Sequence, residues 1–293
     1  MAQEATLERL LREGRRPILV EFDPPRTVEP DAFLTGAREL ASAGADLITI
    51  ADCPIGKASI DASLLAAKLK REYGIEPLPH MACRDRNLNA TRALLMGLSM
   101  EQVSSVLLVT GDPVARESRD TVKGVFHFNS RRLAEALGQL MADGELPPFF
   151  LCGALNVNAR NFAAELEKAR DKERCGIRAF LTQPVSTPQA EENLREARKA
   201  LQGYLLGGLF PIVSHRNALF LRREVAGMVI PDETIAAYEG LSAEEGEALG
   251  RRLCLETAAR IAQDVDGYYI MTPFRRVALV KTILRGLREE PPC

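Results

Sequence analysis

Two carboxylates occupy positions at which a proton donor could be built. Glu21 interrupts the apolar run 17–22 (PILVEF). A carboxyl group buried in such a run has a raised pKa and can act as a general acid near neutral pH. A structural ion pair with an arginine from a neighbouring strand explains the same position equally well. Asp112 follows Gly111 and precedes Pro113, so it is either a second functional carboxylate or a turn-forming aspartate that bonds its own backbone.

Other side chains that could do chemistry give weaker signals. Gln183 follows an apolar run, and its amide can donate and accept at once, which suits an amide-like ring edge or a loop anchor. One imidazole and three thiols could together ligate zinc: His80, Cys83, Cys53 and Cys152. No pair of them has the spacing of a zinc finger or a zinc protease, and cysteine is common in protein cores. We therefore favour buried thiols and expect no metal.

The elements that must position these groups alternate along the chain. Eight short apolar runs, many bounded by Gly or Pro, are typical of strands buried on both faces: 17–22, 46–50, 76–82, 105–110, 148–154, 177–182, 207–213 and 267–271. Helical patterns lie between them at 31–43, 61–73, 89–97, 130–141, 161–174 and 188–201. Ser130 is the expected N-cap of its helix, and Gly44, Gly74 and Gly203 are expected at helix ends.

The interval between the last two strands is longer than the others. It holds three further helical patterns, 216–225, 232–238 and 243–263, and a last helix is expected at 275–287, before a frayed tail at 289–293. Eight strands alternating with helices predict an α/β fold, a (β/α)8 TIM barrel with extra helices between strands seven and eight. An open doubly wound sheet is the rival. No linker divides the chain, so we expect one domain, residues 1–293, with its site at the carboxyl ends of the strands.

Composition and missing motifs exclude several classes of function. Lys+Arg is 38 and Asp+Glu is 40, a net charge of -2, so nucleic acid is not an expected partner. No apolar run approaches the ~20 residues of a membrane span, and we expect no membrane association. The sequence contains no GxGxxG, no GxxxxGKS or GxxxxGKT and no GxSxG. A Rossmann dinucleotide site, a P-loop ATPase and a serine hydrolase therefore lose support.

The start of the chain and its cysteines indicate a reducing compartment. Leu7, Leu10 and Leu11 have the spacing of a short amphipathic helix, interrupted by charges that a signal peptide would not carry. Six cysteines, at 53, 83, 152, 175, 254 and 293, form no CxxC pair, so we expect free thiols and a cytoplasmic location.

In their order and spacing, segments from strand one to strand eight resemble the methylenetetrahydrofolate reductases, flavoprotein barrels of one-carbon metabolism. The matching segments are 20–25 (VEFDPP), 79–83 (PHMAC), 108–113 (LVTGDP), 181–184 (LTQP) and 211–214 (PIVS), with 153–161 and 271–275 also similar. The resemblance covers nearly the whole chain. It implies reduction of 5,10-methylenetetrahydrofolate to 5-methyltetrahydrofolate, or its reverse, with FAD as cofactor, in methionine or acetyl-CoA pathway metabolism.

The resemblance also implies roles for single residues. Glu21 would be the general acid that protonates the bridging nitrogen of the folate, and Asp112 would lie near both flavin and pterin. On the folate side stand Gln183, Arg275 and Asn217. The residues that fall where the family binds FAD are His80, Thr110, Gly111, Asp112, Asn129, Asn156 and Lys172.

Some positions depart from the pattern of familiar enterobacterial members. They are Ala51, Asp52 and Cys53, where a Thr-Tyr pair stands, Thr110, where an arginine stands, and the region of Cys152, which has no tyrosine. The sequence is more similar to the reductase halves of bifunctional homocysteine methyltransferase–reductases and to acetogen-type reductases. This implies NAD(P)H or a partner redox subunit as electron donor, in a homo- or hetero-oligomer. A pterin-binding methyltransferase and a folate-binding subunit of a larger redox complex remain the alternatives.

Overall fold

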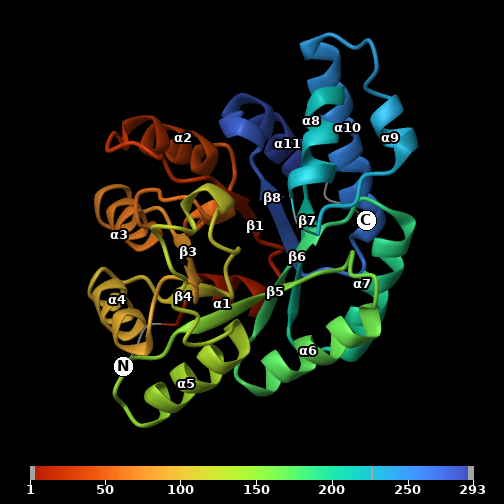
Figure 1. The fold of residues 1–293 in the computed structure, drawn as a ribbon. Helices are drawn as coiled ribbons and strands as arrows, with labels where there is room; N and C mark the ends of the chain where they lie inside the picture. The colour runs from red at the N-terminus through yellow and green to blue at the C-terminus, as the bar shows by residue number, and fades with distance from the viewer. Residues whose placement is uncertain (1–3, 226, 290–293) are drawn as a thin grey trace.

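Eight parallel strands close into a barrel in sequence order, with β8 pairing back to β1 (Figure 1). The computed structural model describes residues 4–225 and 227–289. The strands are β1 Ile18–Glu21, β2 Leu47–Ile50, β3 Pro77–Ala82, β4 Ser105–Val109, β5 Phe150–Leu155, β6 Ala179–Pro184, β7 Tyr204–Leu209 and β8 Gly267–Met271. The predicted TIM barrel is confirmed, and the open-sheet alternative is wrong because the pairing of β8 with β1 closes the sheet.

Helices surround the barrel on its outer face, except α1, whose leucines pack into the barrel interior. The helices are α1 Thr6–Arg12, α2 Asp31–Ser42, α3 Ala62–Tyr73, α4 Leu88–Met100, α5 Ser130–Ala142, α6 Phe162–Arg174, α7 Pro188–Ala200, α8 His215–Glu224, α9 Asp232–Ala236, α10 Ala243–Ile261 and α11 Val277–Glu289. Three short 3-10 turns are η1 Pro54–Gly56, η2 Arg116–Ser118 and η3 Pro273–Arg275. The extra helices predicted between the last two strands are α8, α9 and α10, which Figure 1 shows grouped beside β7 and β8.

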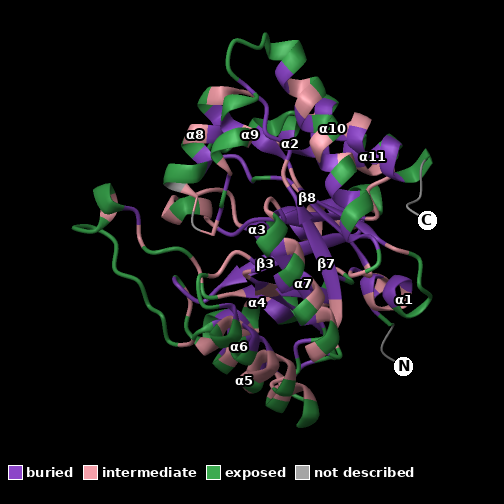
Figure 2. Cartoon of the chain, turned by 90° about the vertical axis from the view of Figure 1, so that its right-hand side faces the viewer, coloured by how far each residue is buried: buried purple, intermediate pink, exposed green. Residues whose placement is uncertain are grey.

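The interior of the barrel is filled by side chains that alternate along each strand. One layer carries Leu19, Leu47, Leu78 and Leu107 from the first four strands, and the buried leucines of α1 pack into the same cluster. Figure 2 shows the strands of the barrel as buried. Because side chains on one face of a strand recur every second residue, the next inward positions lie at the carboxyl ends. These positions carry Glu21, Thr49 and His80 on three adjacent strands. The alternation therefore places polar groups at one mouth of an apolar barrel.

Strand seven lies three residues earlier than expected. The apolar run predicts a start at Gly207, whereas β7 starts at Tyr204 and contains Gly207 and Gly208. A Cβ on Gly207 would lie 2.7 Å from Ile261 of α10, and one on Gly208 would lie 2.5 Å from the Thr182 carbonyl oxygen. The glycines permit close packing rather than mark the start of a strand. The strand then ends before Pro211, which has no N–H to pair.

Two expected helix caps are wrong. Asn129, not Ser130, caps α5, because its side-chain oxygen accepts the Arg132 N–H at 3.0 Å. Gly203 does not end α7, which stops at Ala200. Gly74, by contrast, ends α3 in the left-handed conformation with φ 64°. The expected tail falls mostly on residues 290–293, outside the described residues.

The described cysteines are all free thiols, in agreement with the sequence analysis. Within residues 4–225 and 227–289, no helix combines the length and the apolar character that crossing a membrane requires.

Two Gly→Ala changes should have opposite effects on stability, because Gly250 of α10 contacts the segment after β7 and Gly97 of α4 has free space around it. A Cβ on Gly250 would lie 2.0 Å from the Ile212 carbonyl oxygen, which also accepts the Tyr238 hydroxyl. Gly250→Ala should therefore destabilise the protein by about 1–3 kcal/mol. Gly97 is exposed within α4 with no atom near its added Cβ, so Gly97→Ala should stabilise by roughly 1 kcal/mol. Urea unfolding of both variants measures this; equal shifts would contradict the contact.

Candidate active site

Glu21 lies at the end of β1 with its carboxyl group inside the mouth of the barrel. Its Oε2 accepts a hydrogen bond from the hydroxyl of Tyr269 on β8, and Nε2 of His80 on β3 lies 3.7 Å from the same oxygen. The side chain keeps 23% of its surface exposed, so it is reachable from the mouth. Among the described residues no arginine or lysine forms an ion pair with Glu21. The interpretation of Glu21 as half of a structural ion pair with an arginine is therefore wrong.

The surroundings of Glu21 favour its protonated form. Burial, together with the nearby carboxylates of Asp23 and Asp112, raises the pKa of Glu21 to about 8. Burial also lowers the pKa of His80 to about 4, so the imidazole beside the carboxyl is neutral at pH 7. Its Nε2 is buried and has no hydrogen-bond partner among the described residues. At neutral pH, Glu21 therefore holds a proton beside an uncharged neighbour.

Asp112 follows β4, and its carboxylate binds the backbone of the loop after β2. Its Oδ2 accepts the Ile55 N–H at 2.9 Å, and its carbonyl oxygen accepts Nη1 of Arg84 at 3.1 Å. The alternative of a turn aspartate bonding its own backbone is wrong, because the backbone it holds belongs to the loop after β2. Gly111 before it has φ 91°, and a Cβ there would lie 3.0 Å from Cβ of Ala82. The exposed Asp112 is thus held at the rim by crossed loop contacts.

The loop after β2 is bent sharply where Asp112 holds it. Cys53 and Ile55 have φ of 48° and 52°, a conformation unfavourable for non-glycine residues. Gly56 follows with φ 69°, and a Cβ there would lie 2.4 Å from the Pro113 carbonyl oxygen. Such strain persists only where surrounding contacts impose it. The loops after β2 and β4 therefore form one tightly packed wall of the mouth.

Asp52, a departure from the enterobacterial pattern, is a buried structural group. Its Oδ2 accepts the Ala82 N–H at 2.9 Å and bonds Nη1 of Arg86. Nη2 of Arg86 also reaches Oδ2 of Asp61, the N-cap of α3, at 2.7 Å. This chain of charge-assisted bonds ties the end of β2 to the end of β3 and to α3. It fixes the backbone on which His80 stands.

Gln183 occupies an irregular stretch at the end of β6. The pairing of β6 with β7 shifts register between Leu181 and Pro184, and Oγ1 of Thr182 accepts the Gly208 N–H at 2.8 Å. A bulge of this kind re-aims the side chains of its strand. The Gln183 amide forms no hydrogen bond to any described residue, so both its donor and its acceptor are available.

The strand-five asparagines connect three loops. Oδ1 of Asn156 accepts the Asn158 N–H at 3.0 Å. The Asn158 amide then donates to the carbonyl oxygens of Pro184, at 2.9 Å, and Gly227, at 3.0 Å. A Cβ on Gly227 would lie 3.3 Å from Cγ of Gln183, so the segment after α8 lies directly over the end of β6. Asn156 and Gln183, named separately from sequence, thus share one side of the mouth.

Three residues predicted to bind FAD already bond other parts of the chain. Thr110 Oγ1 accepts the Ser130 N–H at 3.3 Å, and Asn129 caps α5. Nζ of Lys172 donates to the Ala154 carbonyl oxygen at 2.6 Å, and burial lowers the pKa of this lysine. Thr110 keeps a hydroxyl proton to donate and is exposed at the rim, whereas the Lys172 ammonium is engaged in the barrel wall.

The two remaining predicted folate contacts flank β7 and β8. Nη2 of Arg275 donates to the Pro24 carbonyl oxygen at 3.2 Å, which brings the end of β8 against the loop that follows Glu21. Asn217 is buried in the first turn of α8, and its Oδ1 accepts the Val213 N–H at 3.1 Å. Its Nδ2 is buried without a partner among the described residues.

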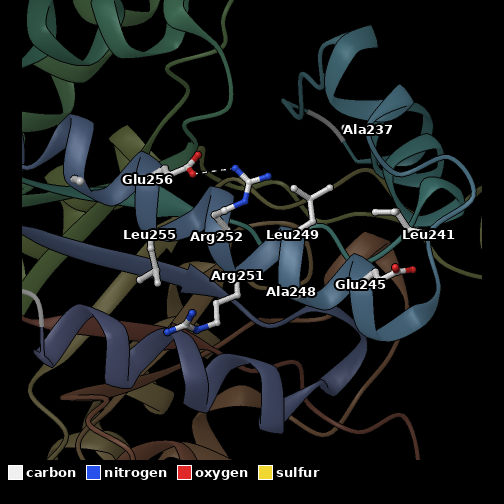
Figure 3. A pocket seen from close by; sticks show the side chains of 10 residues that line it. Ala237, Leu241, Glu245, Ala248, Leu249, Arg251, Arg252, Leu255 and Glu256 are labelled. Carbon is white, nitrogen blue, oxygen red and sulfur yellow. Dashed lines mark hydrogen bonds and ion pairs between the residues drawn. The ribbon is translucent and has the colours of Figure 1, made fainter.

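Among the described residues, metal-ligand clusters and hollows provide no second candidate that shares residues with this mouth. In the described part of the chain, no three His, Cys, Asp or Glu side chains gather closely enough to hold a metal ion. A hollow of about 820 Å³ lies along α10, between residues such as Leu241, Arg252 and Glu256 (Figure 3). Its lining includes none of the predicted site residues.

Sequence reasoning missed Tyr269. The run GYYIM predicts an apolar strand, and its two tyrosines are adjacent in sequence. Tyr268 and Tyr269 must face opposite sides of β8, and only Tyr269 points into the barrel. That alternation was the available signal, since a buried tyrosine hydroxyl needs a partner.

The raised pKa of Glu21 predicts a pH-dependent effect of Glu21→Gln on stability. The ordinary carboxyl pKa is 4.5 and the folded value about 8, so the folded state binds more protons between these pH values. Wild-type stability should therefore fall as pH rises from 4.5 to 8, by up to about 1.4 kcal/mol per pH unit. Glu21→Gln removes this loss. Urea unfolding at several pH values should show the variant gaining on wild type toward pH 8, and a pH-independent difference would contradict the raised pKa.

Comparison with known proteins assigns the family. The sequence model of the family described as methylenetetrahydrofolate reductase matches residues 6–287 of this chain. One similar solved structure is an uncharacterized protein from Clostridium thermocellum that binds two copies of 5-methyl-5,6,7,8-tetrahydrofolic acid. It has 14% identity and a TM-score of 0.67, covering 97% of this chain and 99% of that one.

Two further structures share the fold at lower scores. Tryptophan synthase from M. tuberculosis has 12% identity and a TM-score of 0.53, covering 98% of each chain. Yersinia pestis DHPS with a pterine-sulfa conjugate has 12% identity and a TM-score of 0.51, covering 94% of this chain and 95% of that one. Such identities establish the barrel alone. The family match spans nearly the whole chain, and the protein belongs to the methylenetetrahydrofolate reductase family.

Proposed function

We propose that this protein is a flavin-dependent reductase that converts 5,10-methylenetetrahydrofolate to 5-methyltetrahydrofolate, or runs the reverse reaction. One barrel domain, residues 1–293, would bind both FAD and the folate. The observation that carries the proposal is the carboxyl group of Glu21, protonated at neutral pH inside the mouth of a barrel of this family. A folate reductase needs a proton donor of this kind, and a barrel that only binds folate does not.

The proposed chemistry uses one proton and one hydride. A proton from Glu21 passes to the bridging nitrogen of the folate, so an O–H bond breaks as an N–H bond forms. The five-membered ring then opens by cleavage of a C–N bond and leaves an electrophilic iminium carbon. A flavin held in the mouth would supply the hydride for that carbon. The protein contributes orientation, the proton and a pocket that excludes water.

The residues around the mouth have the donors and acceptors that a pterin requires. The free amide of Gln183 can pair with the edge of the pterin ring, and Asp112 can accept from its amino-pyrimidine side. Arg275 and Asn217 are the proposed contacts to the rest of the folate. The unpartnered Nδ2 of Asn217 is consistent with this role.

The β3–β4 side of the mouth fits a flavin. His80 presents a buried Nε2 that lacks a partner among the described residues, and Thr110, the half-buried Gly111 and Asp112 follow the neighbouring strand β4, with Thr110 and Asp112 exposed. These four residues would hold the flavin. Three more are proposed as FAD contacts, Asn129, Asn156 and Lys172, and each would have to share a bond that it makes within the chain.

The electron donor and cellular setting are proposed from the family pattern. We propose NAD(P)H or a partner redox subunit as donor, a homo- or hetero-oligomer, a cytoplasmic location, and a role in methionine or acetyl-CoA pathway metabolism. The free cysteines are consistent with a reducing compartment.

An anaerobic absorbance spectrum of the purified protein tests the function directly. We expect a flavin band that changes when 5-methyltetrahydrofolate is added, because the reverse reaction reduces the flavin. A flavin band that does not respond would count against the folate reaction. Absence of flavin, even after FAD is supplied, would favour a pterin-binding methyltransferase or a folate-binding subunit of a larger redox complex.

Glu21→Gln separates the two half-reactions. The change removes the proton donor but little volume, so folate reduction should fall by roughly 100-fold or more, while flavin reduction by an artificial donor stays nearly unchanged. Stopped-flow absorbance measures both rates. Glu76→Gln is the matched control, because Glu76 precedes β3 at the other end of the barrel and pairs with Lys70. Equal loss of both half-reactions in Glu21→Gln would overturn the assigned role.

A further inference from the structure

Tyr269 is the described residue that donates a hydrogen bond to Glu21. It stands on β8, paired with Leu19 of β1, and its ring belongs to the buried cluster inside the barrel. Only 5% of the residue is exposed. Its hydroxyl therefore approaches the carboxyl group from within the protein and leaves the mouth open to a substrate.

We propose that Tyr269 is a positioning residue, whose hydroxyl keeps Oε2 of Glu21 as a hydrogen-bond acceptor and so confines the transferable proton to Oε1. The proposal rests on the proposed function, in which Glu21 is the acid. It concerns which of the two oxygens delivers the proton.

The argument follows from counting hydrogens. A neutral carboxyl group carries one proton, and a proton on Oε2 would compete with the hydrogen that Tyr269 donates to that oxygen. Nε2 of His80 also lies on the Oε2 side, at 3.7 Å. No described residue bonds Oε1. Oε1 is thus the oxygen left for the proton and for the substrate.

Among the described residues, no other group around Glu21 makes this contact. Nε2 of His80 from β3 stays at 3.7 Å without a hydrogen bond, and the carboxyl groups of Asp23 and Asp112 lie in the loops after β1 and β4. Thr49 of β2 pairs with Glu21 in register, but its hydroxyl has no hydrogen-bond partner among the described residues. Loss of the Tyr269 hydroxyl would therefore leave the carboxylate form without a described donor.

The neighbouring tyrosine supplies a matched control. Tyr268 is equally buried on the same strand, and its hydroxyl donates to the Ala258 carbonyl oxygen in α10 at 3.0 Å. Tyr268→Phe and Tyr269→Phe each remove one buried hydroxyl and leave the ring in place. The bond is lost inside the barrel in Tyr269→Phe and outside it in Tyr268→Phe. A loss of stability that comes only from removing a buried hydroxyl should therefore appear in both variants.

The test is an infrared titration of the holoenzyme, with the Glu21 carboxyl band assigned by its absence in Glu21→Gln. In Tyr269→Phe the titration midpoint should rise by about one to two pH units, because the carboxylate loses a donor. Folate reduction should slow by about tenfold or more, whereas flavin reduction by an artificial donor should not change. Tyr268→Phe should keep the wild-type midpoint and both rates.

Two results would overturn the proposal: an unchanged midpoint in Tyr269→Phe, or the same shift in both tyrosine variants. Failure of the proposed function is recognised separately. If Glu21→Gln reduces folate at the wild-type rate, Glu21 is not the acid, and the inference about proton delivery falls with it. In that case the difference in the Glu21 titration midpoint between wild type and Tyr269→Phe still shows whether the Tyr269 hydroxyl bonds the carboxyl group.

Discussion

A carboxyl group enclosed by a barrel, with neutral partners in place of a cation, is the constraint on which the rest of this structure depends. Burial without an ion pair costs free energy in the charged form, so Glu21 stays protonated near neutral pH. The barrel can hold such a group because the layer beneath it is packed with leucines and sealed by α1.

The walls of the mouth are made rigid by bonds that cross between loops. Asp52, Arg86 and Asp61 tie β2, β3 and α3 together, while Asp112 and Arg84 join the loops after β2 and β4. Cys53 and Ile55 in the loop after β2 keep the left-handed backbone conformation because these contacts hold the loop in place. A site that must align a proton donor with a ring system benefits from such fixed loops.

The wall of the mouth at the ends of β5 and β6 is formed with the help of the extra helices. Asn158 and the bulge of β6 bring the segment after α8 over Gln183, so the extra helices contribute backbone to the mouth. They pack closely on β7 only because glycines 207, 246 and 250 leave room for neighbouring atoms. The extra helices are therefore integral to the barrel, and their insertion shapes one side of the site.

The sequence by itself determined the barrel, the extra helices and the strand ends that carry polar groups. The reason is that buried parallel strands produce short apolar runs, and the polar residues come at or directly after the ends of these runs. It also singled out Glu21, since a carboxylate in an apolar run is unusual. Only the tertiary structure decided what surrounds each residue: that Tyr269 rather than an arginine meets Glu21, that Asn129 caps α5, and that Lys172 bonds the barrel wall. These pairings join residues up to 248 positions apart. They depend on barrel closure and strand register, which local patterns of hydrophobicity do not encode.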